Sequence, residues 1–514
     1  MRVQRGLMVS ASRDPRAVLQ PALLEHLPAA VARPAYDRAA ITRGIAHIGV
    51  GAFHRAHQAE FTDDLLAGGA TRWGIAGINI RPPRLTETLG RQQGLYTRLI
   101  REDQSVEARV IGSIVSVTDS QESATPALAV LAAPDIDVIT MTVTEKGYCH
   151  TPATGALDAS RPEIVHDLAD PQAPTSLPGL ILRALELRMR THGRPVTVVS
   201  CDNIPANGDI LGAVVRELAA RRGGGLAGWI EANAAFPGTM VDRIAPATSA
   251  ADYALVESHF GYRDDAVVVG EPFRQWVIEN RFAGPFPAFD SVGATFVEDV
   301  TAFEHLKMRI LNGAQTSLCY LGVLAGHEHT FDDMADPLLA GFARRMLIEE
   351  SLSTLAPVPG IDPAAYVEQS LARLRNTAIH HRNHQIATDG SQKIAQRLLN
   401  PIRDRLAADT GIELLSLAVA GWMAYLVRAS DRFGNAWTAD DPYAGRVAGI
   451  AERVGADPAG LTDGILAIDA IFAQPLAADP RFRAAVTRHL GGLLADDPMA
   501  HVRRVMAHEG WQDA

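Results

Sequence analysis

Hydrophobic residues follow two different periods in the two parts of this 514-residue chain. Up to about residue 295, short runs rich in Val, Ile and Thr, the pattern of buried strands, alternate with stretches in helical spacing. From residue 296 onward the pattern is helical to the end. Because strands that alternate with helices form a mostly parallel sheet covered on both faces, we predict an α/β domain over residues 1–295 and a mainly α-helical domain over residues 296–514.

The same pattern predicts the individual elements. Residues 1 to about 40 are expected to be irregular and partly helical because prolines interrupt them. The predicted strands begin near residue 45 and cover residues 73–80, 109–117, 138–143 and 196–200, and a helix is predicted around residues 177–190. The amphipathic helical stretches of the second domain lie near residues 363–376, 392–408, 412–428 and 461–473. The domain boundary is placed after the Gly- and Pro-containing segment 282–287.

A glycine turn follows the first predicted strand. Gly49 and Gly51 form a G-x-G sequence ahead of a predicted helix start, which lets the backbone approach a pyrophosphate at that helix N-terminus. The third glycine of the usual dinucleotide fingerprint is absent, so a plain tight turn is the alternative. After the second strand, where an acidic residue would bind the ribose of NAD, the chain instead has Arg81 and Arg84. These arginines either face solvent or accommodate the 2′-phosphate of NADP.

Lysine is scarce in this sequence. Among 48 Lys and Arg residues only Lys146, Lys307 and Lys393 are lysines. Arginine serves equally well in solvated ion pairs, but it does not release its proton, whereas burial or a neighbouring cation can lower the pKa of an ammonium from its usual ~10.4. Lys307 is therefore a candidate acid and base in catalysis.

The neighbours of Lys307 support this role. In a regular helix Glu304 lies ~60°, Gln315 ~80° and Asn312 ~140° from Lys307, so the four polar side chains share one arc of a largely apolar helix. This predicts a buried helix with a polar stripe that faces a cleft. The alternative is an ordinary solvated stripe.

Several motifs resemble those of the polyol-specific long-chain dehydrogenases, which include mannitol 2-dehydrogenase and fructuronate reductase. The signature of that family is Lys, four residues, Asn, two residues, His; Lys307 and Asn312 match it, but Gln315 replaces the histidine. The string Gly-Val-Gly-Ala-Phe-His-Arg-Ala-His-Gln-Ala at 49–59 has the form of the family's nucleotide-binding turn, and the string at 236–244 also resembles the family. The resemblance extends over residues 44–430 and implies a Rossmann-like dinucleotide-binding domain.

The resemblance also implies roles for the residues of the cofactor turn. Gly49, Gly51 and Phe53 line the dinucleotide, and Arg55 reaches a phosphate unless Arg55 and His57 instead make helix-packing hydrogen bonds. Because members of this family mostly use NAD, we expect NAD as the cofactor, with NADP kept open by Arg81.

Further roles concern hydride transfer from a secondary alcohol, which needs a base and donors to the developing alkoxide. The resemblance makes Lys307 the acid and base and places the Asn203 and Asn312 amides on the substrate oxygen, with Glu304 as a proton relay or ion-pair partner. Asp242, Lys393 and Gln315 are expected to bind substrate hydroxyl groups. Simpler alternatives are a helix cap for Asn203 and an ion pair with Arg243 for Asp242.

The substrate expectation depends on the segment Thr144–Cys149, Thr-Glu-Lys-Gly-Tyr-Cys, and on residues 151–158 after it. The sequence of this segment resembles that of fructuronate reductase (D-mannonate oxidoreductase) more than that of mannitol 2-dehydrogenase. A sugar acid needs a cation for its carboxylate, and Lys146 lies at a predicted strand end where it can supply one. The alternatives are an uncharged polyol or ketose and, in a different class, a catalytically silent dinucleotide-binding sensor.

Composition narrows the partners and the location. A net charge of −11 argues against nucleic acid, and no apolar run approaches the ~20 residues of a membrane span. Three cysteines at irregular spacing indicate a reducing compartment, so we expect a cytoplasmic protein. No Cys and His pattern suits a zinc site, and we expect His327 to be structural and the enzyme to be metal-independent. The oligomeric state is not predicted.

Overall fold

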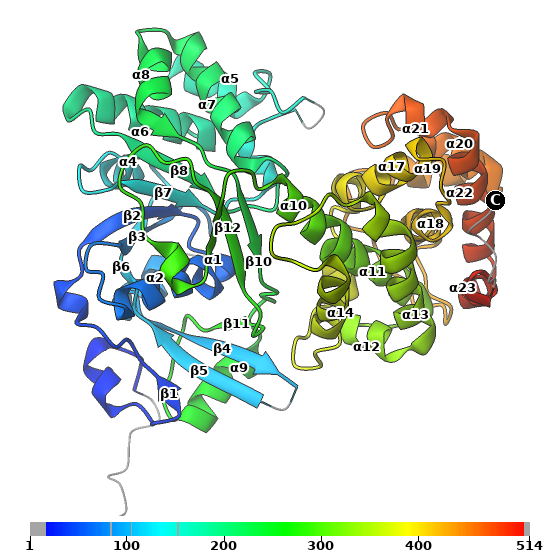
Figure 1. Ribbon diagram of the computed structural model, residues 1–514, viewed down its shortest axis with the longest axis horizontal. Coiled ribbons are helices and arrows are strands. Elements are labelled where there is room, and N and C mark those ends of the chain that lie inside the picture. Colours follow the sequence, from blue (N-terminus) through cyan, green and yellow to red (C-terminus); the bar gives the residue numbers. More distant parts are fainter. Residues whose placement is uncertain (1–16, 83–84, 104, 152–153, 508–514) are drawn as a thin grey trace, which may run out of the picture. The chain divides into compact units, whose positions relative to one another are not determined.

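The computed structural model describes residues 17–82, 85–103, 105–151 and 154–507. Arg84, the second arginine of the predicted 2′-phosphate site, lies outside these residues, as does the beginning of the irregular lead-in. The chain folds into two compact units that divide between Val300 and Thr301. Each unit is described separately below, and both are drawn in Figure 1.

The first unit is built on a six-stranded sheet in which every neighbouring pair of strands is parallel. Its strands are β2 (Arg43–Ile48), β3 (Gly74–Asn79), β6 (Ile114–Asp119), β7 (Val138–Met141), β8 (Val196–Ser200) and β9 (Ala234–Ala235). The spatial order β6-β3-β2-β7-β8-β9 is the 3-2-1-4-5-6 order of dinucleotide-binding folds. This confirms the predicted Rossmann-like domain.

Helices cover both faces of this sheet, because consecutive strand residues point to opposite sides. Ala46, Ala76, Ile139 and Val198 belong to one apolar cluster together with the helices of residues 125–230. Their neighbours Ile45, Ile75, Val138 and Val199 belong to a second cluster on the other face. The helices of this unit are α1 (Ala52–Ala56), α2 (Gln58–Ala67), α3 (Leu85–Arg91), α4 (Thr125–Leu131), α5 (Pro162–Ala169), α6 (Leu177–Thr191), α7 (Asn207–Arg222), α8 (Leu226–Asn233) and α9 (Ala250–Leu255).

Two smaller sheets complete the first unit. One has the order β1-β5-β4-β11 and the other β10-β12-β13. Their strands are β1 (Val31–Ala32), β4 (Tyr96–Glu102), β5 (Ser105–Ile111), β10 (Thr239–Asp242), β11 (Val268–Gly270), β12 (Gln275–Glu279) and β13 (Thr295–Val297).

The predicted single strand over residues 109–117 is wrong. It consists of the end of β5 and the beginning of β6, which belong to different sheets. Gly112 and Ser113 form the break: the Gly112 amide donates to Asp63, and the Ser113 hydroxyl donates to the carbonyl of Ala59. The chain changes sheets there because both groups are bound to α2 instead of to a strand.

The second unit is helical, as predicted. Two long helices, α11 and α18, pack against each other at its centre, and every residue of α11 is buried. Its helices are α10 (Thr301–Lys307), α11 (Gly313–Ala325), α12 (Thr330–Ala335), α13 (Pro337–Arg345), α14 (Pro363–Leu374), α15 (Asn383–Ala387), α16 (Gly390–Ile394), α17 (Asn400–Ala407), α18 (Glu413–Arg428), α19 (Ala444–Val454), α20 (Pro458–Leu466), α21 (Gln474–Ala478), α22 (Pro480–Leu493) and α23 (Pro498–Ala507).

Three π-helical turns interrupt the helices of this unit. They are η6 (Met308–Asn312), η7 (Met346–Ser351) and η9 (Ala395–Leu399). The predicted stretch 392–408 is therefore a run of α16, η9 and α17, and the stretch 461–473 is helical only to Leu466, the end of α20. Among the residues that the structure describes, no helix has the length and apolar character to cross a bilayer.

Gly49 occupies the position where the strand order reverses, between β2 and β7. Its φ is +92°, and a Cβ atom at this position would lie 2.2 Å from the carbonyl oxygen of Thr142, the residue after β7. Both the conformation and the space therefore require glycine. Gly51, two residues later, has a φ of −80°, and its added Cβ would lie 3.8 Å from the nearest atom.

We predict that Gly49→Ala lowers the free energy of unfolding by on the order of 3 kcal/mol, because backbone strain and a steric clash coincide. Gly51→Ala is the matched control and should change it by less than about 1 kcal/mol. Urea denaturation of both variants measures the difference. Equal stability of the two variants would contradict this account of the turn.

Candidate functional site

The glycine turn has the geometry of a dinucleotide cradle. The Gly49 amide donates to the carbonyl of Ile78, and the Thr142 hydroxyl donates to the carbonyl of Gly49 at 2.9 Å, so the turn is fixed to both neighbouring strands. Gly51 is exposed and precedes the first residue of α1. Phe53 is half-buried and stacks on His57 at a ring distance of 5.2 Å. A turn without side chains at the carboxyl edge of the sheet fits a dinucleotide phosphate.

Two histidines lie directly beneath this turn. The rings of His47 and His54 stack 3.3 Å apart, and neither side chain is exposed. His47 bonds through Nδ1 to the Thr140 hydroxyl and through Nε2 to the Gly49 carbonyl. Burial lowers the pKa of His47 to about 3 and that of His54 well below its usual value, so both imidazoles are neutral near pH 7. Sequence reasoning missed His47, although a histidine inside a buried strand is an unusual signal.

Arg55 points into the interior and not to the turn. Its guanidinium donates to the carbonyl of Ala266 and lies 5.4 Å from the centre of the Tyr96 ring, whose hydroxyl donates to the Arg55 carbonyl. His57 likewise bonds the carbonyl of Gln275 at 2.8 Å. These are the helix-packing bonds of the alternative interpretation, and we do not include Arg55 in the proposed cofactor site.

Arg81 follows β3 in a bend and is exposed. It lies two residues beyond Asn79, which ends the strand. Within the described residues 79–82, the chain at the end of β3 has no acidic residue of its own, in agreement with the sequence.

A buried network connects the segment after β7 with the end of β8. The Asp202 carboxylate accepts from the amides of Val143 and Thr144 at 3.0 and 3.1 Å and from the Tyr148 hydroxyl at 2.6 Å. Tyr148 has no exposed surface and also bonds Ser200. Burial raises the pKa of the Asp202 carboxyl, while these three donors act in the opposite direction.

The predicted residues Asn203 and Lys146 flank this network. Asn203 directly follows Asp202 and is exposed, and Lys146 is exposed within the 3₁₀ turn η3 (Glu145–Tyr148). Sequence reasoning identified both motifs but missed Asp202 and Tyr148 as the residues that join them. The signal was present, since a carboxylate at one strand end and a tyrosine beyond the neighbouring strand end meet at the same edge of a parallel sheet.

Asp242 ends β10 and is 2% exposed. The neighbouring Arg243 forms its ion pair with Glu60 at 2.5 Å and also donates to the carbonyl of Ala56. The guanidinium of Arg243 thus has a carboxylate partner on α2. Close by, Asn207 bonds both the amide and the carbonyl of Thr239 and so fixes the start of β10 to α7.

In the helical unit, Glu304, Lys307, Asn312 and Gln315 lie on one continuous helical segment and are all buried, with exposed fractions of 3 to 8%. Lys307 is the last residue of α10 and is 3% exposed. The Asn312 amide donates to the Gln315 side-chain oxygen at 3.5 Å. A solvated stripe is therefore excluded for this segment.

The regular helix assumed for this segment is wrong at one point. The π-helical turn η6 begins directly after Lys307 and ends at Asn312. Since a π turn is closed over five residues, these two side chains lie closer in angle than the ~140° of a regular helix. Such turns occur frequently at functional sites.

Lys393 lies on α16 and is half-buried. Its ammonium donates to the carbonyls of Ile386 and Thr388 at 3.2 and 2.5 Å. Asp389, between these elements, has a φ of +54°. The π turn after Lys393, η9, is bonded to α11, the helix that carries Gln315, because Arg397 donates to the hydroxyl of Thr316 at 2.9 Å.

His327 has a carboxylate partner. Its Nδ1 lies 3.0 Å from Asp333, to which Asn383 also donates, and this bond raises the pKa of His327. The described part of the chain contains no group of three or more His, Cys, Asp or Glu side chains arranged to hold a metal ion.

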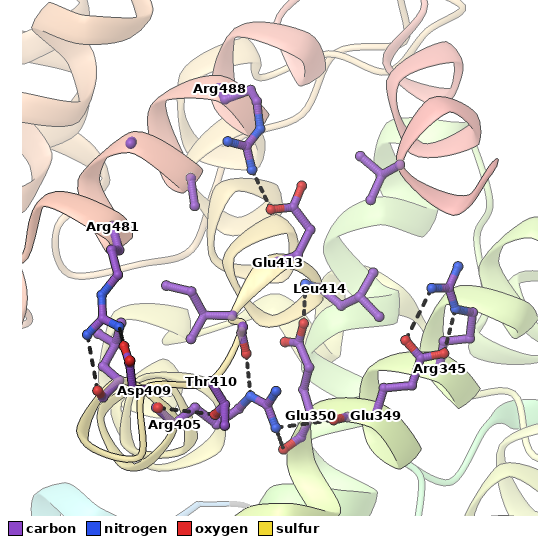
Figure 2. Close-up of a pocket in the computed structure, with 16 residues that line it drawn as sticks. Arg345, Glu349, Glu350, Arg405, Asp409, Thr410, Glu413, Leu414, Arg481 and Arg488 are labelled. Atoms are coloured by element: carbon purple, nitrogen blue, oxygen red, sulfur yellow. Dashed lines mark hydrogen bonds and ion pairs between the residues drawn. The ribbon is translucent and has the colours of Figure 1, made fainter. Parts of the chain in front are cut away.

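A pocket of about 910 Å³ lies within the helical unit, and none of the predicted site residues line it (Figure 2). Three of its four arginines are paired with carboxylates: Arg345 with Glu349, Arg481 with Asp409, and Arg488 with Glu413. Glu350 accepts from the amides of Leu414 and Leu415 at the beginning of α18, and burial raises its pKa to about 7. These ion pairs and hydrogen bonds connect the ends of α17, α18 and η7.

A Rossmann domain followed by a helical domain defines the class of this protein, and comparisons identify its family. The family model described as mannitol dehydrogenase Rossmann domain matches residues 43–291, and the mannitol dehydrogenase C-terminal domain matches residues 299–494. The chain belongs to the mannitol dehydrogenase family and is an oxidoreductase.

Characterised relatives carry two different names. The chain is 41% identical to the D-mannonate oxidoreductase of Escherichia coli (strain K12), over 89% of this chain and 94% of the relative. It is 39% identical to the mannitol 2-dehydrogenase of Cereibacter sphaeroides, over 78% of this chain and 84% of the relative. Among solved structures, the Pseudomonas fluorescens mannitol 2-dehydrogenase in a ternary complex with NAD and D-mannitol has a TM-score of 0.88 at 37% identity, over 95% of this chain and 99% of that one.

The buried histidines predict acid sensitivity. Because the folded-state pKa values of His47, His54 and His57 are depressed, the native state binds fewer protons than the unfolded state. Their contribution to stability is complete above the unfolded pKa of ~6.5 and is lost as the pH falls below it. We predict that His54→Phe reduces the loss of unfolding free energy between pH 6 and 5 by about 1.4 kcal/mol per pH unit.

Urea denaturation at several pH values, followed by tryptophan fluorescence, measures this slope. His259→Phe is the control, because His259 is exposed, and it should leave the slope unchanged. A His54→Phe variant with the same pH dependence as the wild type would show that this imidazole is not held neutral.

Proposed function

We propose that this chain is an NAD-dependent dehydrogenase that interconverts a secondary alcohol and a ketone on a sugar acid, with fructuronate and D-mannonate as the substrate pair. In this proposal residues 1–295 bind the dinucleotide and residues 296–514 supply the acid and base. The observation that carries it is Lys307: in a chain with three lysines, this one is 97% buried and occupies the lysine position of the family signature.

The proposed chemistry assigns one task to each side chain. When bound, NAD accepts the hydride. Lys307 takes the hydroxyl proton during oxidation and returns it during reduction, and the Asn203 and Asn312 amides donate to the oxygen as its charge develops. Glu304, one helical turn before Lys307, passes the proton onward. A buried ammonium needs such a relay, because bulk water does not reach it.

On the cofactor side, Gly49, Gly51 and Phe53 would hold the dinucleotide. The demand for glycine at Gly49 and the open space at Gly51 support this assignment. The structurally similar mannitol 2-dehydrogenase in complex with NAD supports NAD over NADP. The exposed Arg81 keeps NADP as the alternative, because its cation stands where a carboxylate would select NAD.

On the substrate side, Asp242, Lys393 and Gln315 would bind hydroxyl groups, and Lys146 would bind the carboxylate of a sugar acid. The Thr-Glu-Lys-Gly-Tyr-Cys segment and the 41% identity to a D-mannonate oxidoreductase support the acid substrate. The second candidate is mannitol 2-dehydrogenase activity, favoured by the structural neighbour solved with D-mannitol. The non-enzyme alternative is a catalytically silent dinucleotide-binding sensor, which Gln315 in place of the family histidine suggests. Such a protein would bind NAD and turn over neither compound.

We predict that Lys307→Ala and Lys307→Arg each lower kcat by about 10³-fold, because neither side chain can exchange a proton near neutral pH. NAD affinity, measured by fluorescence titration, should stay within about threefold if the cofactor is held by other residues. His305→Ala on the exposed side of the same helix is the control and should retain activity. Turnover by Lys307→Ala at the wild-type rate would refute the assignment.

Initial rates of turnover, measured with D-mannonate and with D-mannitol and for each with NAD and with NADP, identify the preferred substrate and cofactor. We expect the wild type to prefer D-mannonate and NAD. Lys146→Ala should raise the KM for D-mannonate by about tenfold and leave that for D-mannitol unchanged, since only the acid has a carboxylate for the ammonium. A wild-type preference for mannitol would assign the polyol activity instead.

A further inference from the structure

One carboxylate connects two of the segments that carry predicted site residues in the first unit, those of Lys146 and Asn203. The Asp202 carboxylate accepts hydrogen bonds from the amides of Val143 and Thr144 and from the hydroxyl of Tyr148. Tyr148 is itself held from the other side by the Ser200 hydroxyl at 2.5 Å. Segment 143–148 is therefore anchored at both of its ends to a single residue at the end of β8.

The anchored segment is strained. Thr144 has φ +76° and ψ 157°, a combination that is essentially confined to glycine and is especially unfavourable for a β-branched side chain. Cys149, directly after the segment, has a φ of +53°. Such a conformation persists only where the surroundings impose it, and here the amide of the strained residue donates to Asp202.

The strained segment contains Lys146, and the anchor directly precedes Asn203. We propose that Asp202 is a positioning residue: it holds segment 143–148 in its strained conformation and thereby sets the affinity for the substrate carboxylate through Lys146. This proposal depends on the function proposed above and extends it. It identifies the residue that makes the lysine selective, although Asp202 itself is not assigned any contact with substrate.

Asp202→Asn tests the anchor, because an amide presents a donor where the carboxylate has its second acceptor oxygen. We expect the KM for D-mannonate to rise by about tenfold, as is typical when hydrogen bonds to a charged group are lost, while the KM for D-mannitol changes by less than about threefold. Tyr148→Phe removes one of the three donors and should act in the same direction to a smaller extent. Hydrogen exchange of the backbone amides of residues 143–148 should become faster in Asp202→Asn.

A second substitution separates positioning from general stability. Glycine adopts the backbone angles of Thr144 without strain, so Thr144→Gly in the Asp202→Asn background should recover at least half of the lost selectivity. The matched control is Asp167→Asn. Asp167 is another buried carboxylate that anchors a loop, through the amides of Thr175 and Ser176, and its substitution should leave the ratio of the two KM values unchanged.

The outcomes distinguish this inference from the proposed function. Equal increases of both KM values in Asp202→Asn, no recovery with Thr144→Gly, or the same shift in Asp167→Asn would each overturn the inference while wild-type turnover of D-mannonate still upheld the function. If the wild type turns over neither compound, the proposed function fails. In that case hydrogen exchange of the backbone amides still tests whether Asp202 anchors segment 143–148. An unchanged exchange rate in Asp202→Asn would overturn this role of Asp202.

Discussion

The first unit depends on the close approach of Gly49 to the carbonyl of Thr142. At this point β2 and β7 end side by side, and the missing side chain of Gly49 lets the two chain segments pass within a distance that no Cβ atom permits. His47 strengthens the junction through bonds to the backbone of Gly49 and to Thr142. The next amide, that of Val143, donates to Asp202. The cofactor turn, the strained segment and the end of β8 are thus connected by consecutive short contacts.

In the helical unit the corresponding constraint is the burial of Lys307. An ammonium removed from water must keep its hydrogen bonds, and this requires polar groups on the same face of a helix that is otherwise packed among apolar side chains. The turn η6 brings Asn312 closer in angle to Lys307 than a regular helix would, while Met308, Ile310 and Leu311 stay buried. In a regular helix the amide and the ammonium would lie ~140° apart, at the two ends of the polar arc.

Periodicity predicted the layers of the fold correctly and failed where a single residue changes the geometry. Strands of the parallel sheet were found because both of their faces are apolar, and the helix at 177–190 because its apolar residues recur at helical spacing. The segment 109–117 was joined into one strand because Gly112 and Ser113 differ from strand residues only through their bonds to Asp63 and Ala59. The π turn at 308–312 was missed because one additional residue per turn leaves the apolar pattern almost unchanged.

The same limit applies to individual site residues. Motifs, scarcity and the family resemblance predicted Gly49, Lys307 and Asn203 as site residues, and the structure shows that position 49 requires glycine. For Arg55 the motif left a phosphate contact and a packing bond open, and the guanidinium donates to the carbonyl of Ala266, more than 200 positions away in the chain. Asp202 escaped notice because its donors come from a neighbouring strand end. Contacts between distant segments determine these roles, and local sequence does not encode them.

Gln315 shows how the helical unit adapts when one residue of a motif changes. Its side-chain oxygen accepts from the Asn312 amide, so glutamine orients Asn312 and leaves the second N–H of that amide for another acceptor. A histidine at this position could also exchange a proton, whereas glutamine cannot. In the proposed mechanism the proton therefore passes through Lys307 and Glu304. Glutamine thus keeps a hydrogen-bonding group beside Asn312 without adding a group that titrates near neutral pH.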